Sequence, residues 1–109
     1  MHREELLNRL EAHYRESGWA VRSRDDSTVR AVGPGGVTWI GMAVVAEDLA
    51  SAEINERLLA LSDERMDGGR VVCPFELLPA PECADDLRTR LRELHVADRG
   101  HVTVYSVAA

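Results

Sequence analysis

Residues 37–46 restrict the fold more than any other part of the chain, because these ten consecutive residues include almost no polar side chain. A strand with one face in solvent alternates apolar and polar residues, whereas a strand covered on both faces is apolar throughout. The stretch therefore predicts the central strand of a sheet that is flanked by helices on both faces.

The residues before this strand predict one helix and two further strands. Apolar residues recur at helical spacing near the N-terminus, and Ser17-Gly18 is typical of a helix end. The apolar positions of this helix are Leu6, Leu7, Leu10 and Tyr14. An alternating pattern from Trp19 to Arg22, a turn at 25–27 and a second alternating stretch at 28–32 then predict an antiparallel meander with a glycine-rich loop at 33–36.

The residues after the central strand predict a helix, a strand, a second helix and a final strand. Asp48 or Ser51 can cap the first of these helices, which is expected to end at Gly68-Gly69. A short strand is expected at 70–75, interrupted or ended by Pro74, and a stiff connection at 78–81 leads to the next helix. The apolar positions of the two helices are Ile54, Leu58 and Leu61, then Ala84, Leu87, Leu91 and Leu94. The final strand is expected at 101–107.

The resulting order, αβββαβαβ, predicts one three-layer domain over residues 1–109. Its class lies at the border of α/β and α+β, with a mixed sheet that begins as an antiparallel meander. A chain of 109 residues has room for one core of this kind.

Charge composition excludes several chemistries. All thirteen basic residues are arginine, and without lysine there can be no Schiff-base enzyme, no pyridoxal phosphate anchor and no Walker-type phosphate loop. The nineteen acidic residues give a net charge of −6, which argues against a nucleic-acid partner. No apolar run is long enough to span a membrane, and the N-terminus lacks a signal-peptide pattern, so we expect a cytoplasmic protein without a membrane partner.

The element order, together with Gly18-Trp19-Ala20-Val21 at the start of the first strand, resembles the restriction-endonuclease-like superfamily of PD-(D/E)xK nucleases. Members of that superfamily place an acidic residue on the second strand and an acid-x-lysine pair on the third. Here residues 28–32 contain no carboxylate, and residues 40–43 contain neither an acid nor a lysine. The resemblance therefore implies the fold of that superfamily without its catalytic motif.

A displaced metal site is the form in which nuclease activity could survive. Four carboxylates flank the second and third strands: Asp25, Asp26, Glu47 and Asp48. They could bind a divalent metal only if the two pairs bend toward each other. The alternative is that the first pair belongs to a turn and the second to a helix cap.

Other residue groups have a functional and a structural interpretation. Two cysteines and two histidines could form a zinc site: Cys73, Cys83, His95 and His101. They are separated by nine, eleven and five intervening residues, a spacing that matches no compact zinc motif. Cys83 lies beside an expected helix N-terminus, which would favour its thiolate, but His95 and His101 are a helix length away along the chain, so a structural role is favoured. Arg88 and Arg92 share one helix face and could bind an anion or belong to a solvated face whose charge is offset by Asp85, Asp86 and Glu93. Trp39 could anchor a partner, although a strand position among apolar residues favours a place in the core.

No assembled catalytic group emerges from these patterns, so the sequence favours a small noncatalytic domain that binds another protein. We expect no cofactor and no metal. A homodimer formed through an edge strand or a helix is one form of such contact. The alternatives are a divergent metal-dependent nuclease and a binding protein that resembles secretion chaperones or immunity proteins.

Overall fold

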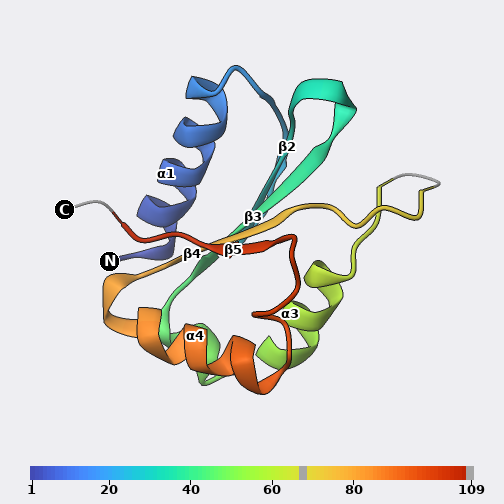
Figure 1. Ribbon diagram of the computed structural model, residues 1–109. Coiled ribbons are helices and arrows are strands. Elements are labelled where there is room, and N and C mark those ends of the chain that lie inside the picture. Colours follow the sequence, from blue (N-terminus) through green and yellow to red (C-terminus); the bar gives the residue numbers. More distant parts are fainter. Residues whose placement is uncertain (67–68, 108–109) are drawn as a thin grey trace.

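A computed structural model describes residues 1–66 and 69–107. It contains the predicted elements in the predicted order, with a short additional helix after the third strand (Figure 1). The helices are α1 (Arg3–Glu16), α2 (Ala46–Leu49), α3 (Ile54–Ser62) and α4 (Ala84–Glu93), with single 3-10 turns at Pro34–Gly36 and Pro81–Cys83. The strands are β1 (Ala20–Arg24), β2 (Thr28–Val32), β3 (Thr38–Val44), β4 (Phe75–Pro79) and β5 (Val102–Val104).

The five strands form one mixed sheet in the order β1-β2-β3-β4-β5. The first three strands are antiparallel neighbours, whereas β4 runs parallel to β3, and β5 runs parallel to β4. The prediction that the apolar run forms the central strand is confirmed, since β3 lies in the middle of the sheet with residues 40–44 fully buried. The fold is therefore of the α/β class, as predicted.

Helix α1 covers one face of the sheet. Its buried residues are Leu6, Leu7, Leu10 and Tyr14, which are the four apolar positions that the periodicity identified. Gly41 lets this helix approach the middle of β3, because a Cβ added there would lie 2.6 Å from the Tyr14 hydroxyl oxygen. This close contact fixes α1 across β1, β2 and β3.

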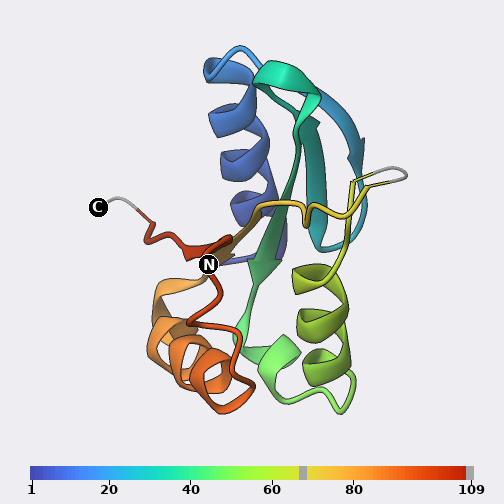
Figure 2. The same ribbon diagram turned by 45° about the vertical axis from the view of Figure 1, so that its right-hand side comes forward.

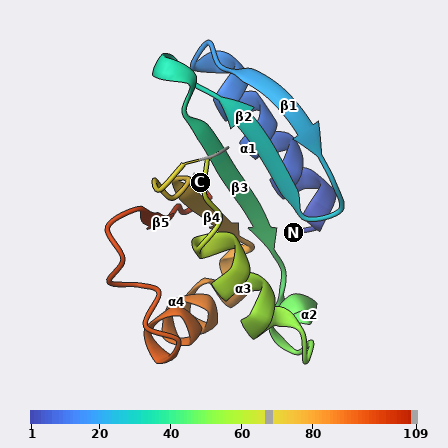
Figure 3. The same ribbon diagram turned by 90° about the vertical axis from the view of Figure 1, so that its right-hand side faces the viewer.

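Helices α3 and α4 lie on the other face of the sheet (Figures 2 and 3). Met42, whose side chain points away from the α1 face, lines a cleft together with Ile54 of α3. Val102 and Val104 of β5 line a different cleft with Leu91 of α4. The predicted arrangement of helices on both faces is thus confirmed.

Three boundaries of the last two strands differ from the prediction, and two of them lie where a proline lacks a backbone N–H. Strand β4 begins after Pro74, at Phe75, whose N–H is the first to bond to the final strand (N···O of His101, 2.9 Å). Strand β4 then continues through the predicted stiff connection to Pro79. In a parallel ladder Pro79 would be the next residue to donate to the final strand after Leu77, and it has no proton to donate. Strand β5 therefore ends at Val104 instead of continuing to residue 107.

Helix α3 also ends earlier than predicted. It stops at Ser62, and the following residues turn into an isolated bridge between Arg65 and Val72. The predicted helix end at Gly68-Gly69 falls partly outside the described residues, because residue 68 is not among them. Buried Ser62 donates its hydroxyl to the carbonyl of Leu59 (2.9 Å), an interaction that competes with continued helix.

Candidate functional site

Two of the four predicted carboxylates have local structural roles. Asp25 Oδ1 accepts hydrogen bonds from the backbone N–H groups of Ser27 (2.9 Å) and Thr28 (2.7 Å), which closes the turn before β2. Burial alone would raise the pKa of Asp25, but these hydrogen bonds and the nearby Arg57 hold it below its ordinary value. Asp48 accepts from the N–H of Val45 (2.9 Å) at the start of α2 and forms an ion pair with Arg3 (2.5 Å).

The four carboxylates do not gather at one point. Asp26 and Asp48 line one cleft of about 250 Å³, which also contains Arg3 and Arg57. Glu47 lines a different cleft, next to the N-terminus. Across residues 1–66 and 69–107, no three histidine, cysteine, aspartate or glutamate side chains are grouped so that they could hold a metal ion.

Cys83 occupies the position before α4, as the sequence indicated, but its environment does not favour the thiolate. Its side chain is 1% exposed, and its Sγ contacts the carbonyl oxygens of Ala80 (3.5 Å) and Val44 (3.6 Å). Burial and the neighbouring Glu82 raise the pKa of Cys83, which agrees with the structural interpretation of this residue. Cys73 is also buried, and His101 instead contacts the carbonyl of Ser62 (2.6 Å).

Trp39 belongs to a row of aromatic rings at one end of the α1 face. Its ring lies 4.7 Å from that of Trp19, which stacks on Tyr14 at 5.6 Å. Half-buried Trp39 packs against the core, which agrees with the structural interpretation of this residue.

A buried carboxylate on β4 was not among the site residues expected from the sequence. Glu76 of β4 is 3% exposed, and its two oxygens accept hydrogen bonds from the hydroxyls of Tyr14 (2.8 Å) and Tyr105. Burial and the negative charge of Glu76 raise the pKa of both phenols, that of Tyr105 to about 12, so both are protonated donors at neutral pH. The sequence did contain an indication of this buried carboxylate, since Glu76 is the one charged residue within residues 71–80.

This cluster ties three elements together rather than offering a reactive group. Tyr14 comes from α1, Glu76 from β4 and Tyr105 from the segment that follows β5. Each carboxylate oxygen already accepts a hydrogen bond from a phenol hydroxyl, which leaves the two oxygens poorly placed to take a proton from a substrate. The cluster therefore holds the end of β5 against the α1 side of the sheet.

Strand β5 ends the sheet, and within residues 1–66 and 69–107 no further strand pairs with its outer edge. The carbonyl of His101 and the N–H of Tyr105 bond to β4, so the odd-numbered residues of this strand turn their backbone groups inward. Val102 and Val104 consequently turn theirs outward, and the Val102 N–H bonds back to the carbonyl of Arg99 (3.2 Å). The Val104 N–H and both outward carbonyls face the open edge of the sheet.

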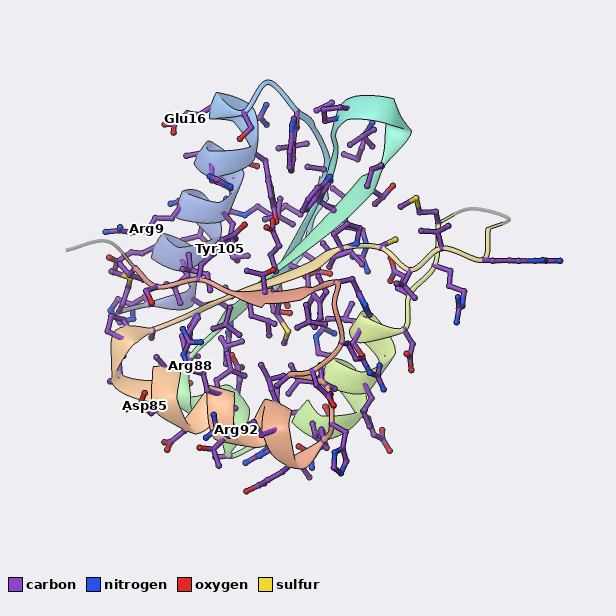
Figure 4. The ribbon with its side chains drawn as sticks, viewed as in Figure 1. Arg9, Glu16, Asp85, Arg88, Arg92 and Tyr105 are labelled. Atoms are coloured by element: carbon purple, nitrogen blue, oxygen red, sulfur yellow. The ribbon has the colours of Figure 1, made fainter. Side chains whose placement is uncertain are left out.

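A cleft lies on each side of this edge. The cleft on the α1 side has a volume of about 290 Å³, and its lining is Arg9, Leu10, His13, Leu78, Tyr105, Ser106 and Val107. The cleft on the α4 side has a volume of about 360 Å³, and its lining is Arg88, Leu91, Arg92, Ala97, Val102, Thr103 and Val104. Figure 4 shows Arg9 on α1 above β5 and Arg88 and Arg92 on α4 below it.

The arginines of these two clefts lack carboxylate partners among the described residues. Arg88 and Arg92 share a face of α4, as predicted, and within the described part of the chain Arg92 bonds only to Thr89 (3.1 Å). Arg90 points elsewhere, to Asn55 and the carbonyl of Leu49. The acidic residues expected to offset this charge form no ion pair with Arg88 or Arg92 in the part of the chain that the structure describes: Asp85, Asp86 and Glu93.

No protein-family model, curated protein or solved structure matches this chain. Among the described residues, no helix is both long and apolar enough to cross a membrane.

Proposed function

We propose that this chain is a noncatalytic domain that binds another protein through the open edge of β5. The observation that carries the proposal is the pair of clefts along this edge, one on each face of the sheet. An exposed strand edge presents unpaired backbone groups that a second chain can use for hydrogen bonding. The clefts supply places for the side chains of that second chain.

The other edge of the sheet supports this choice by contrast. Strand β1 has a bulge between Val21 and Ser23 and carries Arg22 and Arg24, which are two devices that protect an edge from pairing. Strand β5 consists of Val102, Thr103 and Val104 and has no charged side chain. The edge at β1 is thus protected from pairing with a further strand, whereas the edge at β5 is available for such pairing.

The roles of the acidic residues also support a noncatalytic function. Asp25 closes a turn, Asp48 caps α2 and pairs with Arg3, and Glu76 accepts hydrogen bonds from two phenol hydroxyls. At buried Glu76 both oxygens already accept a hydrogen bond, whereas a general acid or base needs at least one oxygen within reach of a substrate proton. On this proposal, the resemblance to PD-(D/E)xK nucleases is one of architecture, to a member that does not cleave nucleic acid.

Site-specific photocrosslinking tests this function. A benzophenone amino acid is placed at exposed Thr103 on β5, with exposed Ser23 on β1 as the matched control, and the protein is irradiated in the cells that make it. We expect a discrete protein adduct from position 103 that is absent from position 23. Equal adducts from both positions, or none from position 103, would contradict the proposal.

A further inference from the structure

We infer that the partner segment at β5 is an extended peptide with acidic residues at alternate positions, which joins the sheet as a sixth strand. This inference rests on the proposed function and adds the chemistry of the partner. It follows from three features of the edge: its backbone groups, the alternation of its side chains and its charge.

The backbone of β5 offers a short row of hydrogen-bonding groups. The N–H and carbonyl of Val104 and the carbonyl of Val102 point away from β4, as the inward bonds of His101 and Tyr105 require. A peptide in extended conformation can donate to the carbonyls and accept from the Val104 N–H. Because β5 has only three residues, the added strand is expected to be short as well.

The two clefts correspond to the two faces of such an added strand. Successive side chains of a strand point to opposite faces of the sheet. Alternate peptide side chains would therefore enter the α4-side cleft, beside Arg88 and Arg92, while those between them enter the α1-side cleft. The α1-side cleft also contains Arg9 and His13, but most of its lining is apolar, including Leu10, Leu78 and the Tyr105 ring, which suits apolar side chains.

Charge determines which residues fit the α4-side cleft. The chain has a net charge of −6, and most of its other arginines are paired with carboxylates or backbone carbonyls. Arg88 and Arg92 instead lie at the edge without such a partner among residues 1–66 and 69–107. Glutamate or aspartate at every second position of the peptide would supply the carboxylates, which guanidinium groups bind with two parallel hydrogen bonds.

The same features disfavour two other occupants. A second copy pairing through β5 in antiparallel fashion would be related by a two-fold axis perpendicular to the sheet, which places α4 of both copies on the same face. Arg88 and Arg92 of the two copies would then repel each other. A nucleic acid would use the arginines, but its backbone has no groups that match an alternating strand edge.

Binding of synthetic octapeptides, measured by fluorescence anisotropy, tests the inference. The probes are a peptide that alternates glutamate with valine and its counterpart that alternates lysine with valine. We expect the glutamate peptide to bind at least about 10-fold more tightly, with an affinity that falls as salt is added. Equal affinities of the two peptides would overturn the inference, even if crosslinking at Thr103 has yielded an adduct.

Protein variants locate the binding site. The double variant Arg88→Ala/Arg92→Ala should weaken binding of the glutamate peptide by about 10-fold, since each exposed ion pair between arginine and glutamate accounts for a few-fold difference in affinity. Arg22→Ala, which removes an exposed arginine from the protected edge β1, should leave the affinity unchanged. The reverse pattern would place the peptide on the other edge and contradict the inference.

A modified peptide and one further variant test the backbone pairing. Two further peptides carry N-methyl groups on alternate backbone amides, one on the odd-numbered residues and the other on the even-numbered residues. The protein itself is unchanged, and one of the two peptides should not bind, because its methylated amides are those that would donate to β5. Val104→Pro removes the outward N–H but none of the bonds to β4, and should also weaken binding. If both methylated peptides bind normally, strand addition is wrong. A thymidine oligonucleotide that binds more tightly than the peptide, through the same arginines, would contradict the inference too.

Discussion

Replacing Tyr14 with phenylalanine tests whether the buried cluster around Glu76 stabilises the fold. Tyr14 is fully buried, Glu76 is 3% exposed, and the phenol donates to Glu76 Oε1 at 2.8 Å. The substitution keeps the ring and its stacking on Trp19, so it creates no cavity and removes only the hydrogen bond. A hydrogen bond to a charged group contributes about 1.5–3 kcal/mol, and here its loss leaves a buried carboxylate oxygen without that donor.

We therefore expect Tyr14→Phe to lower the free energy of unfolding by about 2 kcal/mol. With an m-value of roughly 1.5 kcal/mol/M, the urea midpoint falls by about 1 M while m itself stays the same. Circular dichroism during urea titration measures both quantities. The matched control is Tyr105→Phe, which removes the second donor from a residue that is only half-buried and should cost less.

A double-mutant cycle shows whether the effect comes from this hydrogen bond. In a Glu76→Leu background, Tyr14→Phe should no longer destabilise the protein and should leave its stability unchanged or raise it, because the buried phenol has lost its acceptor. If Tyr14→Phe costs the same in both backgrounds, or costs nothing in the natural chain, the assignment of a stabilising role to this cluster is refuted.

Three further predictions follow from the structure. Gly41→Ala should destabilise the protein by about 1–3 kcal/mol in urea unfolding, since the new methyl group would meet the Tyr14 hydroxyl at 2.6 Å; an unchanged midpoint would contradict the tight contact between α1 and β3. Stability should fall as pH rises from about 10 to about 12, because the phenol of Tyr105 ionises in the unfolded chain at its ordinary pKa and in the folded chain at about 12; below pH 10 this contribution is fully present, and thermal melts of Tyr105→Phe should show a smaller alkaline loss. Cys83 should react with a thiol reagent at the rate of global unfolding at neutral pH, because it is buried and its pKa is raised; rapid labelling of the folded protein would show that its site opens.

The sequence determined the order of the elements and the position of the central strand. These features depend on local patterns: an apolar run for β3, helical spacing for Leu6, Leu10 and Tyr14, and turn residues between the strands. Such patterns record which side of an element is buried, and they are largely independent of which element lies opposite. The bounds of β4 and β5 were harder to predict from the sequence, because they depend on which neighbouring strand would have bonded to the N–H that each proline lacks.

Only the tertiary structure decided which residues form sites. Tyr14 and Glu76 are 62 positions apart, and no local pattern indicates that a helix residue near the N-terminus lies against a glutamate of β4. The same holds for Arg9 and Arg88, which come from different helices and meet the β5 edge from opposite faces of the sheet. The charges of these side chains could be read from the sequence, but whether each charge has a partner depends on how the helices pack on the sheet.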